Sequence, residues 1–253
     1  MNTIRKINRA LGRQNLTPRI LRRKYISSRI NRQLGRMTKI LSRKGLYEFL
    51  SQEYSHILPK SEVLTVGAGG KVNELLDRYS REIGFNVLSF DIDENRGPDI
   101  VGDICSFDFD ERKFEVIVMS EVLEHVHSPH LALDNVYKIL DDGGKLILTT
   151  PFIMPIHDKP CDYYRYTRYG LEFLLKEFKD VQVRERNSYF EAIDVLWVRL
   201  WQTGVRNAHR AAHFFIPLVF IKMPITILLS KLINTNAMTS GYVVTAKKPQ
   251  ANV

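Results

Sequence analysis

From residue 62 onward, the chain alternates between short apolar runs and segments in which apolar side chains recur every three or four residues. The apolar runs are 63–66, 87–90, 116–119 and 146–148, and the helical spacing covers 72–79, 133–140 and 171–178. Continuous apolar strands separated by amphipathic helices are typical of a parallel sheet that is covered on both faces. The pattern therefore predicts an α/β fold.

A basic segment precedes this alternating part. Residues 1–47 hold 14 of the 37 Lys and Arg residues and no acid, whereas the rest of the chain holds 23 against all 28 acids. Apolar side chains at helical spacing, Ile26, Ile30, Leu34, Met37 and Leu41, predict a basic amphipathic helix within this arm. An anionic membrane surface, nucleic acid and packing on the body are the alternatives for its contacts. A mitochondrial presequence is a further one if the source is eukaryotic.

An apolar segment interrupts the fold between the last two expected strands. Phe214–Leu229 is nearly all apolar but contains Pro217, Lys222 and Pro224. No run of 18 apolar residues exists, and two prolines argue against a single spanning helix. We expect two short helices at a lipid interface or an apolar cap over the pocket, with burial in the core or in a dimer as the alternative. The chain thus divides into an arm (1–47), a core (48–188), an insertion (189–236) and a last strand with a tail (237–253).

Composition narrows the class of protein. Of the 253 residues, 44% are apolar and only two are cysteines, Cys105 and Cys161. This excludes a disulfide scaffold and a four-cysteine zinc site. The N-terminus lacks the apolar core of a secretory signal, so we expect a cytoplasmic protein, with the inner face of a membrane as the alternative location.

Three strand ends carry residues suited to a nucleoside. The first strand ends in Val66-Gly67-Ala68-Gly69-Gly70, which allows close approach of a ligand to the backbone and to the next helix N-terminus. Asp91 ends the second strand, where an acid accepts hydrogen bonds from ribose hydroxyls. Asp103 ends a third, where it can bind a base amine while Ile104 packs on the base. Together they predict a nucleoside pocket.

These segments, VLTVGAGG, SFDIDEN, DIVGDI, FEVIVMSEVLEHVHSP and DDGGKLILTTPF, resemble the class I S-adenosylmethionine-dependent methyltransferases of type 11 over residues 60–180. The resemblance implies a Rossmann-like three-layer sandwich whose sheet has seven strands, mostly parallel, with the last strand, GYVVTAKK, antiparallel. It also implies bound S-adenosylmethionine, held by residues Gly67, Ala68, Gly69, Asp91, Ile92, Asp103, Ile104, Ser120 and Glu121. The chain departs from the family pattern at Thr65, where an acid is common, and at Lys71, near which a third glycine is common.

The segment Glu121-Val-Leu-Glu124-His125 has two interpretations. If it is helical, one turn presents Glu121, Glu124 and His125 on the same side, where they could bind a divalent cation such as Mg²⁺, although His is not a typical Mg²⁺ ligand. It resembles the Glu-x-x-Glu-His motif of ubiquinone-biosynthesis and small-RNA methyltransferases, in which a metal is bound. Many methyltransferases carry the same string without metal, and there it lines the cofactor pocket. We expect no metal, with this trio as the alternative.

Residues 155–167 follow the fifth strand, so they are expected over the mouth of the pocket. His157 is the predicted base for a hydroxyl, with Asp158 or Asp162 to orient it and Tyr163 and Arg165 to recognise the acceptor. The alternative is that the tyrosines pack the lid and Arg165 pairs with an Asp. The stretch resembles the P-x-H-x-x-P-x-D-Y-x-R-Y-T pattern of methyltransferases in bacterial surface-saccharide pathways.

These observations predict a methyltransferase that modifies a hydroxyl of a saccharide or lipid-linked saccharide. The expected partners are a small-molecule or lipid-linked acceptor and an anionic membrane surface, contacted through 1–47 and 190–233. The alternatives are an RNA ribose 2′-O-methyltransferase, a quinone or lipid O-methyltransferase, and a cofactor-binding module without turnover.

Overall fold

A computed structural model describes residues 33, 35, 38, 41–202 and 205–250. The sheet has seven strands in the order β3-β2-β1-β4-β5-β7-β6, with β7 antiparallel to both of its neighbours. The strands are β1 (Glu62–Val66), β2 (Asn86–Asp91), β3 (Ile100–Val101), β4 (Phe114–Ser120), β5 (Leu140–Pro151), β6 (Lys179–Glu185) and β7 (Gly241–Lys247). The predicted Rossmann-like fold is therefore confirmed.

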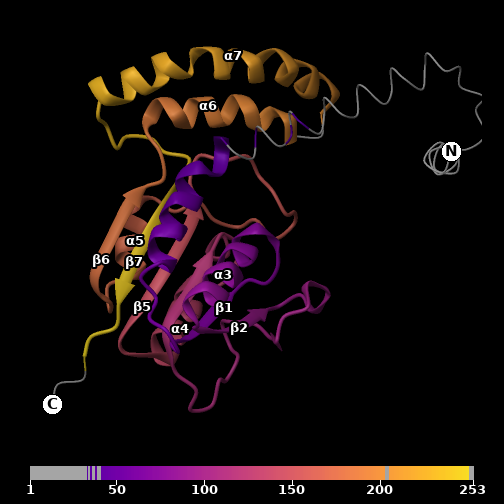
Figure 1. Ribbon diagram of the computed structural model, residues 1–253. Coiled ribbons are helices and arrows are strands. Elements are labelled where there is room, and N and C mark those ends of the chain that lie inside the picture. The colour runs from indigo at the N-terminus through magenta and orange to yellow at the C-terminus, as the bar shows by residue number, and fades with distance from the viewer. Residues whose placement is uncertain (1–32, 34, 36–37, 39–40, 203–204, 251–253) are drawn as a thin grey trace, which may run out of the picture.

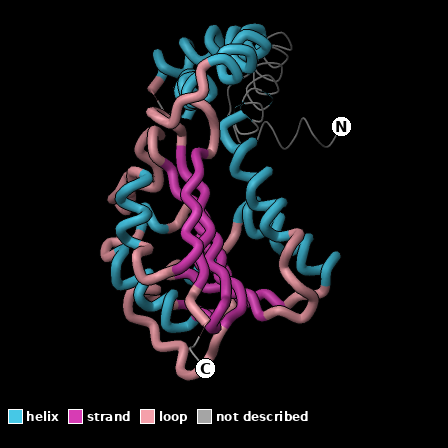
Figure 2. Tube along the Cα trace, turned by 90° about the vertical axis from the view of Figure 1, so that its left-hand side faces the viewer, coloured by secondary structure: helices cyan, strands magenta, loops and turns pink. Residues whose placement is uncertain are grey.

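Helices cover both faces of this sheet (Figures 1 and 2). Alternate residues of each strand point to opposite faces. Val63 packs with the helix of residues 41–54 and with α3 (Gly70–Ile83), and Leu64 with the other face. That second face is covered by α4 (Pro129–Ile139) and α5 (Arg168–Leu174). Three short 3-10 helices, Glu94–Arg96, Leu123–His125 and Leu200–Gln202, lie in the connections.

The helix of residues 41–54 crosses the predicted boundary between arm and core at 47/48. Leu46, Leu50 and Tyr54 are fully buried against the sheet. The boundary is therefore corrected to a position before this helix, because its apolar face belongs to the core. Most of the predicted amphipathic arm lies outside the described residues.

The insertion forms a helical hairpin above the carboxyl ends of the parallel strands (Figure 1). It consists of α6 (Tyr189–Arg199) and α7 (Arg206–Leu232), with α7 as the outer layer. Stacked rings of Trp197 and Phe215, with centroids 4.1 Å apart, join the two helices. Asp194 is buried between them, where it pairs with Lys222 and accepts a hydrogen bond of 2.8 Å from Thr226.

The expectation of two short helices interrupted by proline is wrong for α7. The helix continues through Pro217 and Pro224, both of which are exposed, so the hydrogen bonds that proline removes are lost on the surface, away from the packed side. By length and composition alone, residues 210–232 are sufficient to cross a membrane, although part of the helix is buried on α6.

Candidate functional site

A cavity of about 330 Å³ lies at the carboxyl ends of β1, β2 and β4. Of the residues predicted to bind the cofactor, those that line it are Gly67, Asp91, Ile92, Asp103, Ile104 and Glu121. Ala68, Gly69 and Ser120 are not among the lining residues. Ser120 instead shares a hydrogen bond of 2.8 Å with Thr149. The cavity is of a size for a nucleoside-type ligand.

The glycine turn is held by packing and by the acid of the neighbouring strand. Gly67 has φ 93°, and a Cβ atom there would lie 2.5 Å from Val122 Cγ2, so a larger residue would displace the loop. Ala68 N donates a hydrogen bond of 2.6 Å to Asp91 Oδ2. Gly69 is the N-cap of α3, and a Cβ on it would meet nothing within 4 Å among the described residues. Space is thus left above the helix N-terminus.

The carboxylates of Asp91 and Asp103 are both held by a hydrogen bond from the backbone N–H two residues further along the chain. Asp91 is nearly buried and accepts a second hydrogen bond, 2.9 Å long, from Asp93 N, while Arg96 Nε lies 3.9 Å from its Oδ2. Asp103 Oδ1 accepts from Cys105 N at 2.9 Å. Each carboxylate therefore has a fixed position and keeps acceptor sites for a ligand.

An apolar pair accompanies these acids. Ile104 is buried in the floor of the cavity, whereas the side chain of Ile92 is 69% exposed at its rim. An exposed Ile beside a cavity offers a flat ligand one more apolar surface.

Glu121 is not part of a helix, contrary to the one-turn arrangement considered from the sequence. Its φ is 57°, and only Leu123–His125 form a short 3-10 turn. Arg186, which is buried at the end of β6, holds the Glu121 carboxylate, which also accepts from Thr149 Oγ1 at 3.1 Å. Burial would raise the pKa of Glu121, but the Arg186 guanidinium outweighs it and lowers this pKa below its usual value. Glu121 is thereby separated from Glu124 and His125, its two partners in the metal trio that the sequence offered as an alternative.

Glu124 is fully buried, and neither carboxylate oxygen has a hydrogen-bond partner among the described residues. Its Oε1 lies 3.7 Å from His125 Nε2 and 3.7 Å from His157 Nε2. Burial raises the pKa of Glu124, and this carboxylate in turn raises the pKa of His157. The structure thus brings Glu124 and His125 of the Glu-x-x-Glu-His segment together with the predicted base His157.

In both His125 and His157, the Nδ1 atom, which points away from Glu124, faces oxygen atoms. His125 Nδ1 lies 2.8 Å from the carbonyl oxygen of Cys161. His157 Nδ1 lies 3.3 Å from the carbonyl oxygen of Pro155 and 3.4 Å from Asp162 Oδ2. Since these oxygens only accept, Nδ1 carries the proton in both neutral rings and Nε2 presents a lone pair toward Glu124.

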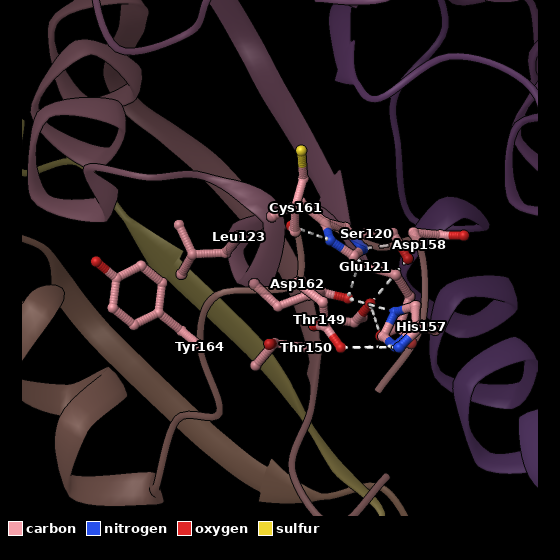
Figure 3. A network of polar contacts seen from close by, with 12 residues as sticks. Ser120, Glu121, Leu123, Thr149, Thr150, His157, Asp158, Cys161, Asp162 and Tyr164 are labelled. Carbon is pink, nitrogen blue, oxygen red and sulfur yellow. Dashed lines mark hydrogen bonds and ion pairs between the residues drawn. The ribbon is translucent and has the colours of Figure 1, made fainter. Parts of the chain in front are cut away.

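The two aspartates predicted to orient His157 have different positions (Figure 3). Asp162 contacts His157 through its ring and through a hydrogen bond of 2.9 Å from His157 N. Asp158 is exposed and lies instead 3.8 Å from His125 Nε2. Asp162 is therefore the aspartate that orients His157.

Arg165 binds Asp162 and does not face an open acceptor site. Its two terminal nitrogens donate hydrogen bonds of 2.5 and 2.6 Å to the two carboxylate oxygens of Asp162. This bond lowers the pKa of Asp162 to about 2. The alternative interpretation, in which Arg165 pairs with an Asp, is the one that the structure favours.

The tyrosines attach residues 155–167 to the loop after β4. Tyr166 Oη donates a hydrogen bond of 3.0 Å to the carbonyl oxygen of Leu123, and Tyr164 Oη one of 3.0 Å to that of His127. Tyr163 N donates to the carbonyl oxygen of Glu124, and the exposed Tyr163 side chain lines the cavity. Of the three tyrosines, Tyr163 is thus the one whose side chain is available to contact a molecule in the cavity.

Sequence reasoning missed Arg186 and Arg96. Arg186 is 65 residues from its partner Glu121, and Arg96 lies in a loop between β2 and β3 where it lines the cavity. No local spacing could have marked either residue, since both act through the tertiary arrangement.

The strand order, the glycine turn and the paired acids define an α/β protein with a nucleoside-sized cavity and a cluster of ionisable residues beside it. A family profile described as a methyltransferase domain matches residues 22–204. The chain therefore belongs to the methyltransferase domain family. The prediction of an S-adenosylmethionine-dependent methyltransferase is confirmed at the level of the family.

Solved structures share the fold at low identity. Phosphoethanolamine N-methyltransferase 2 of Haemonchus contortus, in complex with S-adenosyl-L-methionine, is 16% identical with a TM-score of 0.54, over 81% of this chain and 52% of that one. An S-adenosylmethionine-dependent methyltransferase from Archaeoglobus fulgidus is 14% identical with a TM-score of 0.51, over 81% and 94%. The [4+2]-cyclase SpnF is 16% identical with a TM-score of 0.52, over 81% and 80%.

The chain spans about half the length of the Haemonchus enzyme. No curated protein matches it in sequence. The comparisons thus give the family and the fold, and leave the acceptor to be inferred from the site.

Proposed function

We propose that the protein transfers the methyl group of S-adenosylmethionine to a hydroxyl of a saccharide or lipid-linked saccharide. The observation that carries the choice of a hydroxyl is the cluster of Glu124, His125 and His157 beside the cavity. An amine can react without help once it is neutral, whereas a hydroxyl needs its proton removed as the reaction proceeds. A buried carboxylate with two imidazoles supplies that function.

The residues of the cavity fit the methyl donor. Asp91 would accept hydrogen bonds from the ribose hydroxyls and Asp103 one from the adenine amine, while Ile92 and Ile104 would pack on the base. The open space above Gly69 and the N-terminus of α3 suits the carboxylate end of the ligand. S-adenosylmethionine supplies a methyl group bonded to a positively charged sulfur.

The protein residues position the acceptor and take up its proton. The hydroxyl proton is removed at the cluster, the oxygen forms a bond to the methyl carbon, and the sulfur–methyl bond breaks with its electron pair left on sulfur. Tyr163 and the segment fixed by Asp162 and Arg165 cover the acceptor side. Such positioning and exclusion of water supply about 7–11 kcal/mol in favourable cases.

The exposed side of α7 favours an acceptor at a membrane surface. Its outward apolar residues recur at steps of four and three, and we call them the α7 stripe: Phe214, Leu218, Ile221, Ile225, Leu228 and Leu232. Asp194 is the last acidic residue of the chain, so the helix carries only basic charges. An apolar stripe with basic neighbours is suited to an anionic lipid surface. We therefore propose a cytoplasmic enzyme bound to the face of a membrane.

The proposal is tested by incubating the purified protein with methyl-deuterated S-adenosylmethionine and lipid-linked or free saccharides, followed by mass spectrometry. We expect a labelled O-methyl ether and an equal amount of S-adenosylhomocysteine. Asp91→Ala serves as a control that should yield neither product. A labelled methyl on nitrogen, on RNA or on a quinone would overturn the proposed acceptor.

A further inference from the structure

The interior of the acceptor site contains an electrostatic conflict. The Glu124 side chain is completely buried and both oxygens lack hydrogen-bond partners among the described residues. A buried carboxylate without a partner is costly, because it has lost water and gained nothing in return. The two groups nearest to it, His125 and His157, approach with the ring nitrogens that carry lone pairs in the neutral rings. A cation at the centre of this group would relieve the conflict, because it would pair with the carboxylate and accept both lone pairs.

The outer contacts of the cluster are those of metal-binding histidines. A ligating imidazole usually donates its second N–H to a backbone carbonyl or a carboxylate, which fixes the tautomer and the direction of the free nitrogen. His125 Nδ1 contacts the carbonyl oxygen of Cys161 at 2.8 Å, and His157 Nδ1 contacts Pro155 and Asp162. Both arrangements leave Nε2 directed inward.

The inner atoms are spaced for a single ion. One oxygen of Glu124 and one nitrogen each of His125 and His157 lie within 4.8 Å of one another, and both nitrogens are 3.7 Å from the oxygen. Metal–ligand bonds of about 2.1 Å at tetrahedral angles place ligand atoms about 3.4 Å apart. The two oxygen–nitrogen distances are close to this value, whereas the two nitrogens, which lie within 4.8 Å of each other, would move closer together when an ion binds.

We propose that Glu124, His125 and His157 form a binding site for one divalent transition-metal ion. Two imidazoles and one carboxylate favour Zn²⁺, Mn²⁺, Fe²⁺, Co²⁺ or Ni²⁺ over Mg²⁺ or Ca²⁺, which prefer oxygen ligands. This donor set differs from the trio considered from the sequence, because Arg186 engages Glu121 and His157 takes its place.

If the proposed function holds, an ion at this site would help to remove the proton of the acceptor hydroxyl. His125 lines the cavity together with Asp158 and Tyr163, so an ion bound by His125 would lie beside the cavity, within reach of the acceptor. A hydroxyl bound there loses its proton more readily, and the exposed Asp158, 3.8 Å from His125 Nε2, is placed to receive it. With an ion bound, His157 would be a ligand, and Asp158 would replace the imidazoles of the proposed function as the acceptor of the hydroxyl proton.

The test is titration of metal-stripped full-length protein with Co²⁺ and Zn²⁺, followed by visible absorption and calorimetry. We expect one ion per chain and d–d absorption without an intense sulfur-to-metal charge-transfer band. Glu124→Gln and His157→Ala should each weaken binding at least about tenfold, since each removes a ligand. His130→Ala, an exposed histidine on α4, is the matched control and should bind as the wild type does.

Three results would overturn the inference. One is no binding at micromolar metal, which would leave a shared proton in the cluster and His157 as the base. Another is equal binding by all variants. The third is a sulfur-to-metal band that is lost in Cys105→Ser, which would place the ion at Asp103, Cys105 and His127.

Circular dichroism and calorimetry with S-adenosylmethionine, performed on the same samples, show whether each variant is folded. Failure of the proposed function is recognised separately, as loss of S-adenosylmethionine binding or of methyl transfer whatever the metal content.

Discussion

Among single residues, Asp91 has the most direct influence on the cavity, because one carboxylate both fixes the glycine turn and lines the cavity where we expect the ribose. Asp91→Ala should weaken S-adenosylmethionine binding by about 10–100-fold, as expected when hydrogen bonds to a charged group worth about 1.5–3 kcal/mol are lost. Calorimetry measures the change. Glu82→Ala, which changes an exposed acid in the last turn of α3, should leave the affinity unchanged. Unchanged affinity of Asp91→Ala would contradict the ribose assignment.

Arg186 has a structural influence that no sequence pattern revealed. Its guanidinium is almost completely buried against Glu121, so Arg186→Met leaves that carboxylate without its partner. We expect a loss of about 3–5 kcal/mol in the free energy of unfolding, measured with urea. Arg184→Met, on the exposed side of β6, should cost less than about 1 kcal/mol. Equal effects of the two variants would show that the Glu121–Arg186 pair is not responsible.

At the scale of elements, α7 has two chemically different sides. Its inner side, including Ala212, Ile216 and Val219, is buried in the hairpin, and its outer side carries the α7 stripe. Ile221→Asp combined with Ile225→Asp should reduce cosedimentation with phosphatidylglycerol/phosphatidylcholine vesicles at least about tenfold, since two apolar contacts are replaced by charges.

The matched control for this variant is Leu58→Asp, which changes an exposed leucine between the helix of residues 41–54 and β1. It should sediment with vesicles as the wild type does. Addition of salt should weaken binding of the wild type to these anionic vesicles. Equal sedimentation of the double variant and the wild type would exclude the α7 stripe as the lipid contact.

At the scale of the whole molecule, ligand binding in a cavity formed by several strands should stabilise the complete core. At a concentration 100 times its Kd, S-adenosylmethionine should add about 2.7 kcal/mol, which corresponds to a Tm increase of about 5–10 °C for a domain of this size. Differential scanning calorimetry measures the shift. Adenosine diphosphate at the same concentration should give no comparable increase. A Tm that is insensitive to S-adenosylmethionine would contradict binding.

The sequence alone determined the strands of the sheet and the edge at which the glycine turn and the two acids meet. Apolar runs such as 63–66 and 116–119 identified the strands, because a buried parallel strand must be apolar on both faces. The glycine turn and the acids Asp91 and Asp103 follow strand ends directly, so their common position at one edge of the sheet follows from topology. The fold, and the meeting of Gly67, Asp91 and Asp103 at one cavity, were therefore predictable from local pattern.

The tertiary structure alone decided the acceptor side. Glu124 and His157 are 33 residues apart, Glu121 and Arg186 are 65 apart, and only the folded chain determines which of these side chains meet. It also decided that α7 continues through two prolines, because burial of its inner side on α6 outweighs the local cost of proline. Spacing along a chain predicts which residues share an element, whereas partners from different elements are selected by packing and by the cost of leaving a buried charge unpaired.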